Sequence, residues 1–204
     1  MLTLYGNKQS GSCVKVEYVL RFLDLEFDYK QLDFTKDLKT EWYLKIHPAG
    51  KIPALDDHGF ILFESGAIAR YLCEKHGGKL IPHEVKGRAQ MDQWIDFINL
   101  HLAPAIGKVA FNRVFAPMMG MPVNEQSIET GMKEIERFMP IIDAQLTHGS
   151  HVVGNELSLA DIALLAATGY CEMAKIDLIK YTHFMTWLNL MKGQVWYKKV
   201  HASS

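Results

Sequence analysis

Hydrophobic and polar positions change their spacing along the first third of the chain. Residues 2–5 form a short apolar run, as a buried strand would. Apolar side chains then recur at the i, i+3, i+4 and i+7 spacing of one helical face, which predicts a helix over 12–23. Residues 25–32 alternate between apolar and polar side chains, the period of a half-buried strand. This order predicts a βαβ unit with two parallel strands.

Two more apolar runs, at 52–55 and 60–63, are separated by four turn-forming residues and predict a hairpin. A helix over 65–76 follows and ends at two glycines, while the connection over 36–46 is weakly helical. We therefore expect a first domain over residues 1–77, built as βαβ and then ββα.

Strand patterns do not recur after residue 78. The spacing predicts long helices over 84–115 and 124–147, the first kinked at Pro104 and the second containing Pro140. We place a linker at 78–86.

Ser158 and Asp161 stand three residues apart and predict a capping box at the start of a helix over 158–174. Shorter helices are expected at 178–191 and 193–201. The second domain is then all-helical and covers 87–204.

Composition narrows the function classes. Hydrophobic residues make up 49% of the chain, charged residues 22%, and the net charge is −1, all values of a globular protein with no general attraction to nucleic acid. The chain has no apolar stretch of membrane-spanning length, and its start lacks the pattern of a secretory signal. Three widely spaced cysteines and nine histidines without ligand spacing predict reduced thiols, a cytoplasmic location and no metal site.

Four stretches together resemble the glutathione transferase family. They are Ser10-Gly-Ser-Cys-Val-Lys-Val, His47-Pro-Ala-Gly-Lys-Ile-Pro-Ala-Leu, Phe63-Glu-Ser-Gly-Ala-Ile-Ala-Arg-Tyr-Leu and Gly154-Asn-Glu-Leu-Ser-Leu-Ala-Asp-Ile-Ala. A fifth stretch, which begins at Phe111-Asn-Arg-Val-Phe, is similar to the phi class, with theta-, zeta- and bacterial beta-like relatives as alternatives.

The resemblance implies a thioredoxin-like α/β domain followed by an all-helical domain. It implies a transferase that joins the thiolate of glutathione to hydrophobic electrophiles in detoxification chemistry. Glutathione would be a co-substrate, no other cofactor is expected, and family members are usually homodimers. Two alternatives remain open: a glutathione-dependent peroxidase or thiol reductase using the same site, and a non-catalytic binding or assembly module with this fold.

The resemblance also implies glutathione-binding residues. The bond between Ile52 and Pro53 is cis in similar proteins, which frees the backbone of Ile52 to pair with the extended peptide. Lys51 and Lys39 would meet the glycine carboxylate, or could be ordinary solvated lysines.

Glu64 and Ser65 stand at the entrance of the predicted helix 65–76. Free N–H groups and the helix dipole at such an entrance favour a carboxylate. The resemblance implies that Ser65 holds the γ-glutamyl carboxylate and Glu64 the amine; a plain helix cap is the alternative.

The expected chemistry depends on Ser10, Ser12 and Cys13. A hydroxyl that donates to sulfur beside a helix N-terminus lowers the pKa of a thiol. Ser10 matches the serine of phi-, tau- and zeta-like transferases, with Ser12 as second choice and a simple helix-capping role as the alternative. Tyr5 falls inside the first strand and is a weaker candidate. Cys13 is expected to be packed and inert.

The electrophile pocket is expected in the second domain. Phe111, Phe115 and Met118 are its candidate lining residues, since methionine adapts to varied ligands. Core or dimer contacts would explain the same residues.

Overall fold

The predicted parallel strand pair is present in the computed structural model, which describes residues 1–202. β1 (Leu2–Gly6) pairs in parallel with β2 (Phe27–Gln31), and Leu4 lies opposite Tyr29. The predicted hairpin is β3 (Ala54–Asp57) and β4 (Phe60–Phe63). β3 also runs antiparallel to β1, so that the sheet within the described residues has the order β2-β1-β3-β4.

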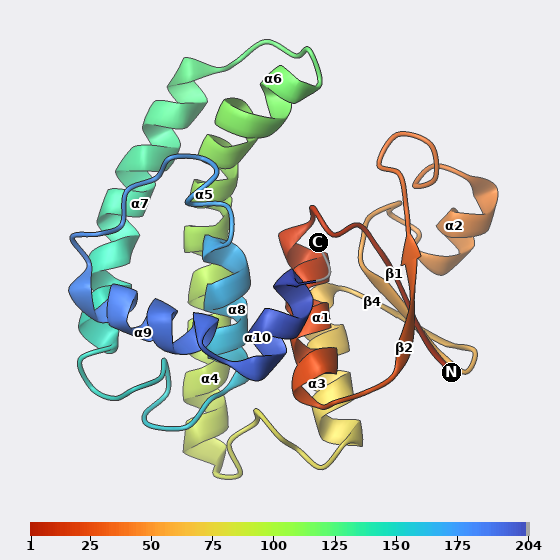
Figure 1. The fold of residues 1–204 in the computed structure, drawn as a ribbon, viewed down its shortest axis with the longest axis horizontal. Coiled ribbons are helices and arrows are strands. Elements are labelled where there is room, and N and C mark those ends of the chain that lie inside the picture. The colour runs from red at the N-terminus through yellow and green to blue at the C-terminus, as the bar shows by residue number, and fades with distance from the viewer. Residues whose placement is uncertain (203–204) are drawn as a thin grey trace. The chain divides into compact units, whose positions relative to one another are not determined.

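Three helices of the first unit follow the order that the sequence predicts. They are α1 (Gly11–Phe22), α2 (Glu41–Ile46) and α3 (Ser65–Lys75). Figure 1 shows α1 and α3 together on one side of the sheet and α2 on the other. The core between the sheet and the α1–α3 pair is built from fully buried side chains, among them Leu4, Val16, Leu20, Leu55, Ile68 and Leu72.

The last helix, α10 (Val195–His201), also packs within this unit, against α1. The ring of Tyr18 lies 5.4 Å from that of Trp196, and its hydroxyl is 2.8 Å from His201 Nε2. The contacts therefore divide the chain into Met1–Ile81 with the segment from Gly193 onward, and Pro82–Lys192. The sequence placed 193–201 with the second domain because the pattern of a helix does not reveal which unit its apolar face contacts.

The second unit is helical, as the resemblance implies. Its elements are α4 (Val85–Phe97), η1 (Ile98–Leu102), α5 (Ala103–Ala110), η2 (Phe111–Phe115), α6 (Ala116–Met118), α7 (Glu125–Gln145), α8 (Leu159–Thr168) and α9 (Thr182–Lys192). Figure 1 shows α5 and α7 running side by side, with α8 next to them.

Two helix predictions in this unit need correction. The helix expected over 84–115 contains two π-helical turns, and Pro104 lies in the first turn of α5 directly after one of them. A π turn uses i→i+5 hydrogen bonds, so some backbone carbonyls in it have no helical N–H partner. A proline, which has no N–H to donate, is therefore accommodated directly after such a turn. The helix expected over 158–174 ends at Thr168 instead, and Arg113 donates to the carbonyls of Ala174 and Lys175 in the turns that follow.

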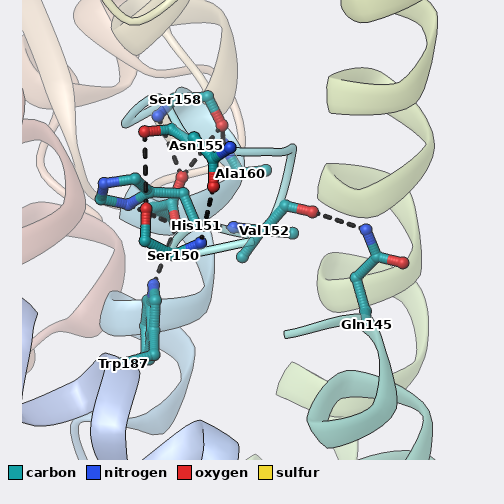
Figure 2. Close-up of polar contacts among 9 residues, drawn as sticks. Gln145, Ser150, His151, Val152, Asn155, Ser158, Ala160 and Trp187 are labelled. Carbon is teal, nitrogen blue, oxygen red and sulfur yellow. Dashed lines mark hydrogen bonds and ion pairs between the residues drawn. The ribbon is translucent and has the colours of Figure 1, made fainter. Parts of the chain in front are cut away.

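The predicted capping box is confirmed and is part of a larger buried network (Figure 2). Asp161 is 0% exposed and accepts hydrogen bonds from the Ser158 N–H at 2.9 Å, the Val152 N–H at 2.9 Å and Trp187 Nε1 at 2.8 Å. Gln145 of α7 donates to the Val152 carbonyl. One carboxylate therefore joins the start of α8, the preceding loop and α9.

Replacing Asp161 with alanine would leave these buried donors without an acceptor. Each unsatisfied buried group costs roughly 1–3 kcal/mol, so we expect Asp161→Ala to lower the free energy of unfolding by about 3–5 kcal/mol. Urea unfolding followed by tryptophan fluorescence measures this change. Glu156→Ala removes an exposed carboxylate from the same loop and is the matched control. Equal stabilities of the two variants would contradict the account.

Candidate functional site

The residues singled out by the sequence meet at one edge of the sheet. In the register of the strands, Tyr5 of β1 lies opposite Ala54 of β3, and Ala54 lies opposite Phe63 of β4. The chain that leaves β1 toward Ser10, the chain that enters β3 through Pro53, and the chain that leaves β4 toward Ser65 are therefore neighbours. All of them belong to the first unit.

The width of this edge fits a short extended peptide. Neighbouring strands lie about 4.8 Å apart, so β1 to β4 spans about 10 Å. An extended chain advances about 3.3 Å per residue, which makes a tripeptide about as long as this span. The arrangement can hold one end of a tripeptide at the start of α3 and its middle between Pro53 and Ser10.

Asn7 fixes the loop between β1 and α1. Its buried amide donates to the Leu32 carbonyl at 2.8 Å and accepts the Gln9 N–H at 2.9 Å, while its own carbonyl accepts the Ser10 N–H at 2.9 Å. Sequence reasoning missed Asn7, although asparagine directly after a strand and a glycine is a turn signal.

Ser10 occupies the N-cap position of α1, but its side chain makes no capping hydrogen bond. The capping alternative for Ser10 is therefore not what the structure shows. The Ser10 side chain, acting as a hydrogen-bond donor, lowers the pKa of Cys13, against the larger effect of burial. Ser12 lies in the first turn of α1 with its side chain exposed. Ser10 is thus the half-buried hydroxyl beside the first turn of α1.

Cys13 is a packed thiol, as expected. Its side chain is 0% exposed, and it forms no disulfide. Burial raises the pKa of the Cys13 thiol to about 11, so it remains protonated near neutral pH. The ring of Tyr5 packs beside Trp42 and Tyr43 of α2, which gives this side chain a structural role.

The segment before β3 has the expected cis bond between Ile52 and Pro53. The Lys51 carbonyl accepts the hydroxyl of Tyr43 at 2.7 Å, which holds this segment against α2. Gly50 has a φ of +57°, and a Cβ on it would lie 2.5 Å from the Leu38 carbonyl oxygen.

That close approach lies beside two lysines. Lys39 follows Leu38 and Lys51 follows Gly50, and both side chains are exposed. The two backbone segments that carry the predicted lysines therefore lie next to each other.

The opposite end of the edge is the start of α3. Glu64 has a φ of +71°, a conformation that costs free energy in a residue with a side chain and marks a constrained turn. Ser65 is buried as the first residue of α3. The turn presents the first N–H groups of an eleven-residue helix.

Two cations that sequence reasoning missed lie beside Glu64. Burial and the nearby Arg70 guanidinium lower the pKa of Lys15 on α1, while Glu64 acts in the opposite direction. Arg70 reaches back along α3 to Gly66, where a Cβ would lie 3.6 Å from its Nη1. Two basic side chains, Lys15 and Arg70, therefore lie near the start of α3. The signal in the sequence was weak, because Lys15 and Arg70 lie on different helices.

His47 is a further residue that the sequence did not assign. Its side chain is 2% exposed and its ring lies 4.7 Å from that of Phe63. His47 therefore joins the turn before Lys51 to Phe63, the residue that precedes Glu64. Burial lowers the pKa of His47, against a smaller opposite effect of Glu64.

The candidate pocket residues of the second unit are placed as follows. Phe111 is 40% exposed and Met118 is 70% exposed, while Phe115 packs edge-on against Tyr170. An open hollow elsewhere in this unit is lined by Gln93, Trp94, Asp96, Phe97, Leu100, His101 and Ile141. Among the described residues, no group of three or more His, Cys, Asp or Glu side chains is placed to hold a metal ion.

Comparisons with known proteins point to one family over most of the chain. The family model for the glutathione S-transferase N-terminal domain matches residues 1–74, and the model for the C-terminal domain matches residues 103–194. Glutathione S-transferase F10 of Arabidopsis thaliana is 33% identical over 185 residues, which cover 87% of this chain and 86% of that protein.

A crystal structure of glutathione transferase F7 from Populus trichocarpa has a TM-score of 0.91 at 27% identity, with 99% of this chain and 98% of that chain covered. A probable elongation factor 1-gamma of Arabidopsis thaliana is 34% identical over 163 residues, which are 78% of this chain but 37% of that protein.

The contact between Gly50 and Leu38 can be tested by Gly50→Ala. The added methyl group would collide with the Leu38 carbonyl and displace Lys51, so we expect the Kd for glutathione to rise several-fold in calorimetry. Gly59→Ala is the matched control, because Gly59 also has a positive φ but no atom within 4 Å of a Cβ. Unchanged affinity in a folded Gly50→Ala protein would show that this turn does not position the ligand.

Burial of His47 predicts a pH dependence of stability. The unfolded chain takes up a proton at His47 near the ordinary value of 6.5, whereas the folded chain resists protonation to a lower pH. Stability should therefore fall as the pH drops below about 6.5. In His47→Asn this loss should be smaller when unfolding is measured at pH 7.5 and at pH 5.5. His148→Asn, which changes an exposed histidine, should keep the wild-type slope.

Proposed function

The chain belongs to the glutathione S-transferase family and is a glutathione transferase, and we propose that Ser10 is the residue that activates the glutathione thiol. The observation that carries the proposal is the common edge of the sheet. Three groups lie side by side there: the Ser10 hydroxyl, the backbone segment before the cis-proline Pro53, and the start of α3. This is the order in which a bound tripeptide would need them.

We propose that glutathione binds across this edge as co-substrate, with no resident cofactor. The γ-glutamyl carboxylate would accept the N–H groups at Ser65, near the positive charges of Lys15 and Arg70. Its amine would meet Glu64. The cysteinyl backbone would pair with Ile52, and the glycine carboxylate would meet the Lys39 and Lys51 pair.

The chemical step needs a thiolate. Only a few per cent of a thiol with a pKa of about 8.5 is ionised at pH 7. A hydrogen bond from the Ser10 hydroxyl, beside the positive end of the α1 dipole, favours the thiolate and lowers that pKa. The thiolate then attacks an electrophilic carbon, a carbon–sulfur bond forms and the leaving group departs with its electron pair. Holding both reactants side by side supplies the rest of the acceleration.

We propose Phe111, Phe115 and Met118 as part of the surface for the electrophile. We further propose a cytoplasmic homodimer that acts in detoxification. These proposals are supported by the resemblance to the phi-class proteins. Among the described residues, no helix is both long and apolar enough to cross a bilayer.

A cysteine-based thiol reductase is disfavoured by the burial of Cys13 and by its raised pKa. A peroxidase that uses the glutathione thiolate would need the same Ser10. The similarity to an elongation factor subunit keeps an assembly role as the second candidate function. That candidate predicts no glutathione binding, whereas the arrangement of Ser10, the cis-proline segment and the start of α3 at one edge favours a catalyst.

Ser10→Ala tests the proposed role. A hydrogen bond to a charged group contributes roughly 1.5–3 kcal/mol, so we expect kcat/KM with an aryl halide to fall by about 10- to 100-fold. Calorimetric affinity for glutathione should change little at a pH where the thiol is protonated. Ser12→Ala is the matched comparison, since its side chain is exposed two residues further along. If Ser12→Ala lost the activity and Ser10→Ala kept it, the proposal would be wrong.

A further inference from the structure

Three methionines lie exposed at the end of α6 and in the turn that follows it. The exposed fractions are 70% for Met118, 54% for Met119 and 47% for Met121, although methionine is among the residue types most often buried. Figure 1 shows α6 and the loop after it at the upper end of the α5–α7 pair. No ionisable side chain occurs between Arg113 and Glu125. An uncharged stretch of chain therefore presents three thioethers to solvent.

Hydrogen bonds hold the backbone of this turn while its side chains stay in solvent. The Met121 N–H donates to the Ala116 carbonyl at 2.8 Å. The Gly120 N–H donates to the Pro117 carbonyl at 3.1 Å, and Gly120 has a φ of +65°. These two bonds form the Schellman motif of a helix end. A Cβ on Gly120 would have no atom within 4 Å, so the space around the turn is open.

The base of the loop is fastened at Asn112. Its side-chain amide donates to the Lys108 carbonyl at 2.9 Å, and its Oδ1 accepts the Asn124 N–H at 2.9 Å. Asn124 in turn caps α7 by accepting the Ser127 N–H. A chemical change on the three methionine side chains would therefore leave both ends of the loop in place.

The cysteine sulfurs of the chain are shielded, in contrast to these thioethers. Cys13, Cys73 and Cys171 are buried, and burial raises the pKa values of their thiols to about 11, 12 and 12. A thiol reacts with a peroxide as its thiolate, so these three groups react slowly near neutral pH. A thioether has no proton to lose, and its reactivity follows its exposure. Exposed methionines are therefore the sulfur atoms that an oxidant reaches.

The reaction of a thioether with a hydroperoxide needs no other group of the protein. A lone pair of the sulfur attacks the terminal peroxide oxygen, a sulfur–oxygen bond forms and the oxygen–oxygen bond breaks. The sulfur loses two electrons, and the peroxide is reduced to an alcohol or to water. The product, methionine sulfoxide, is polar where the thioether was apolar.

We propose that Met118, Met119 and Met121 form a site of reversible oxidation by hydroperoxides, and that their oxidation lowers the affinity of the protein for hydrophobic electrophiles. This inference rests on the proposed role of Phe111, Phe115 and Met118 in binding the electrophile. A sulfoxide oxygen is hydrated, and an apolar ligand that covers it removes this water at a cost in free energy. Glutathione binds in the first unit and should keep its affinity.

The first measurement locates the oxidised residues. The protein is treated with a limiting amount of hydrogen peroxide in the absence of glutathione, and the added oxygen is located by peptide mass spectrometry. We expect Met118, Met119 and Met121 to be oxidised well before Met91 and Met139, which are buried. Equal rates at the exposed and buried methionines would overturn the proposal.

The second measurement compares the kinetics of untreated and oxidised protein, after removal of the peroxide, with a hydrophobic aryl halide. We expect KM for the halide to rise by about three- to tenfold, and the calorimetric affinity for glutathione to stay the same. Methionine sulfoxide reductases with dithiothreitol remove the oxygen as water and should restore KM. A KM that oxidation does not change, or that the reductases do not restore, would contradict the proposal.

The variant Met118→Leu/Met119→Leu/Met121→Leu keeps apolar side chains of similar size that peroxide does not oxidise. Its KM for the halide should be the same before and after peroxide treatment. Met173→Leu is the matched control, because Met173 is 60% exposed but lies outside this loop. This control should lose affinity for the halide on treatment, as the wild type does. Loss of the peroxide effect in Met173→Leu would move the site away from the three methionines.

Untreated wild-type protein separates this inference from the proposed function. If it does not conjugate glutathione to the halide, the proposed function fails first, and the inference fails with it. If it does so with a KM that is insensitive to oxidation of the three methionines, the proposed function stands and this inference alone is wrong.

Discussion

The packing of α1 against the end of β1 is the contact on which the rest of the site depends. Gly6 leaves no room for a side chain beside the Cys13 sulfur, and Asn7 joins the β1–α1 loop to the end of β2. These contacts set the position of Ser10 relative to the sheet. The sheet register then places Pro53, which precedes β3, and Glu64, which follows β4, at adjacent ends of neighbouring strands. A shift of α1 by one residue would separate the hydroxyl from the strand segments that bind the peptide.

Much of the first unit could be predicted from the sequence, because its elements are short and carry distinct periods. The alternation of apolar and polar residues predicts β2, the apolar positions at helical spacing predict α1, and the turn-forming residues predict the hairpin of β3 and β4. The second unit shows the limit of this reasoning. A stretch of apolar positions at helical spacing does not distinguish an α turn from a π turn, so η1 and η2 were not foreseen. Which unit α10 packs against is decided by tertiary contacts, and its pattern of apolar residues does not reveal it.

The site divides in the same way. The family resemblance names Ser10, Lys51, Glu64 and Ser65 as candidates, and each stands in a local motif at the end of an element. Asn7, Lys15, Arg70 and His47 depend on contacts between segments that are distant in sequence. Cys13 was expected to be inert, and its burial agrees with that expectation.

A crystal structure of the protein with glutathione bound tests the central claim most directly. The account predicts the glutathione sulfur within hydrogen-bond distance of the Ser10 oxygen, the γ-glutamyl carboxylate at the Ser65 N–H, and the cysteinyl backbone paired with Ile52. A sulfur that instead lies at Ser12, or a peptide bound away from the edge formed by β1, β3 and β4, would contradict it.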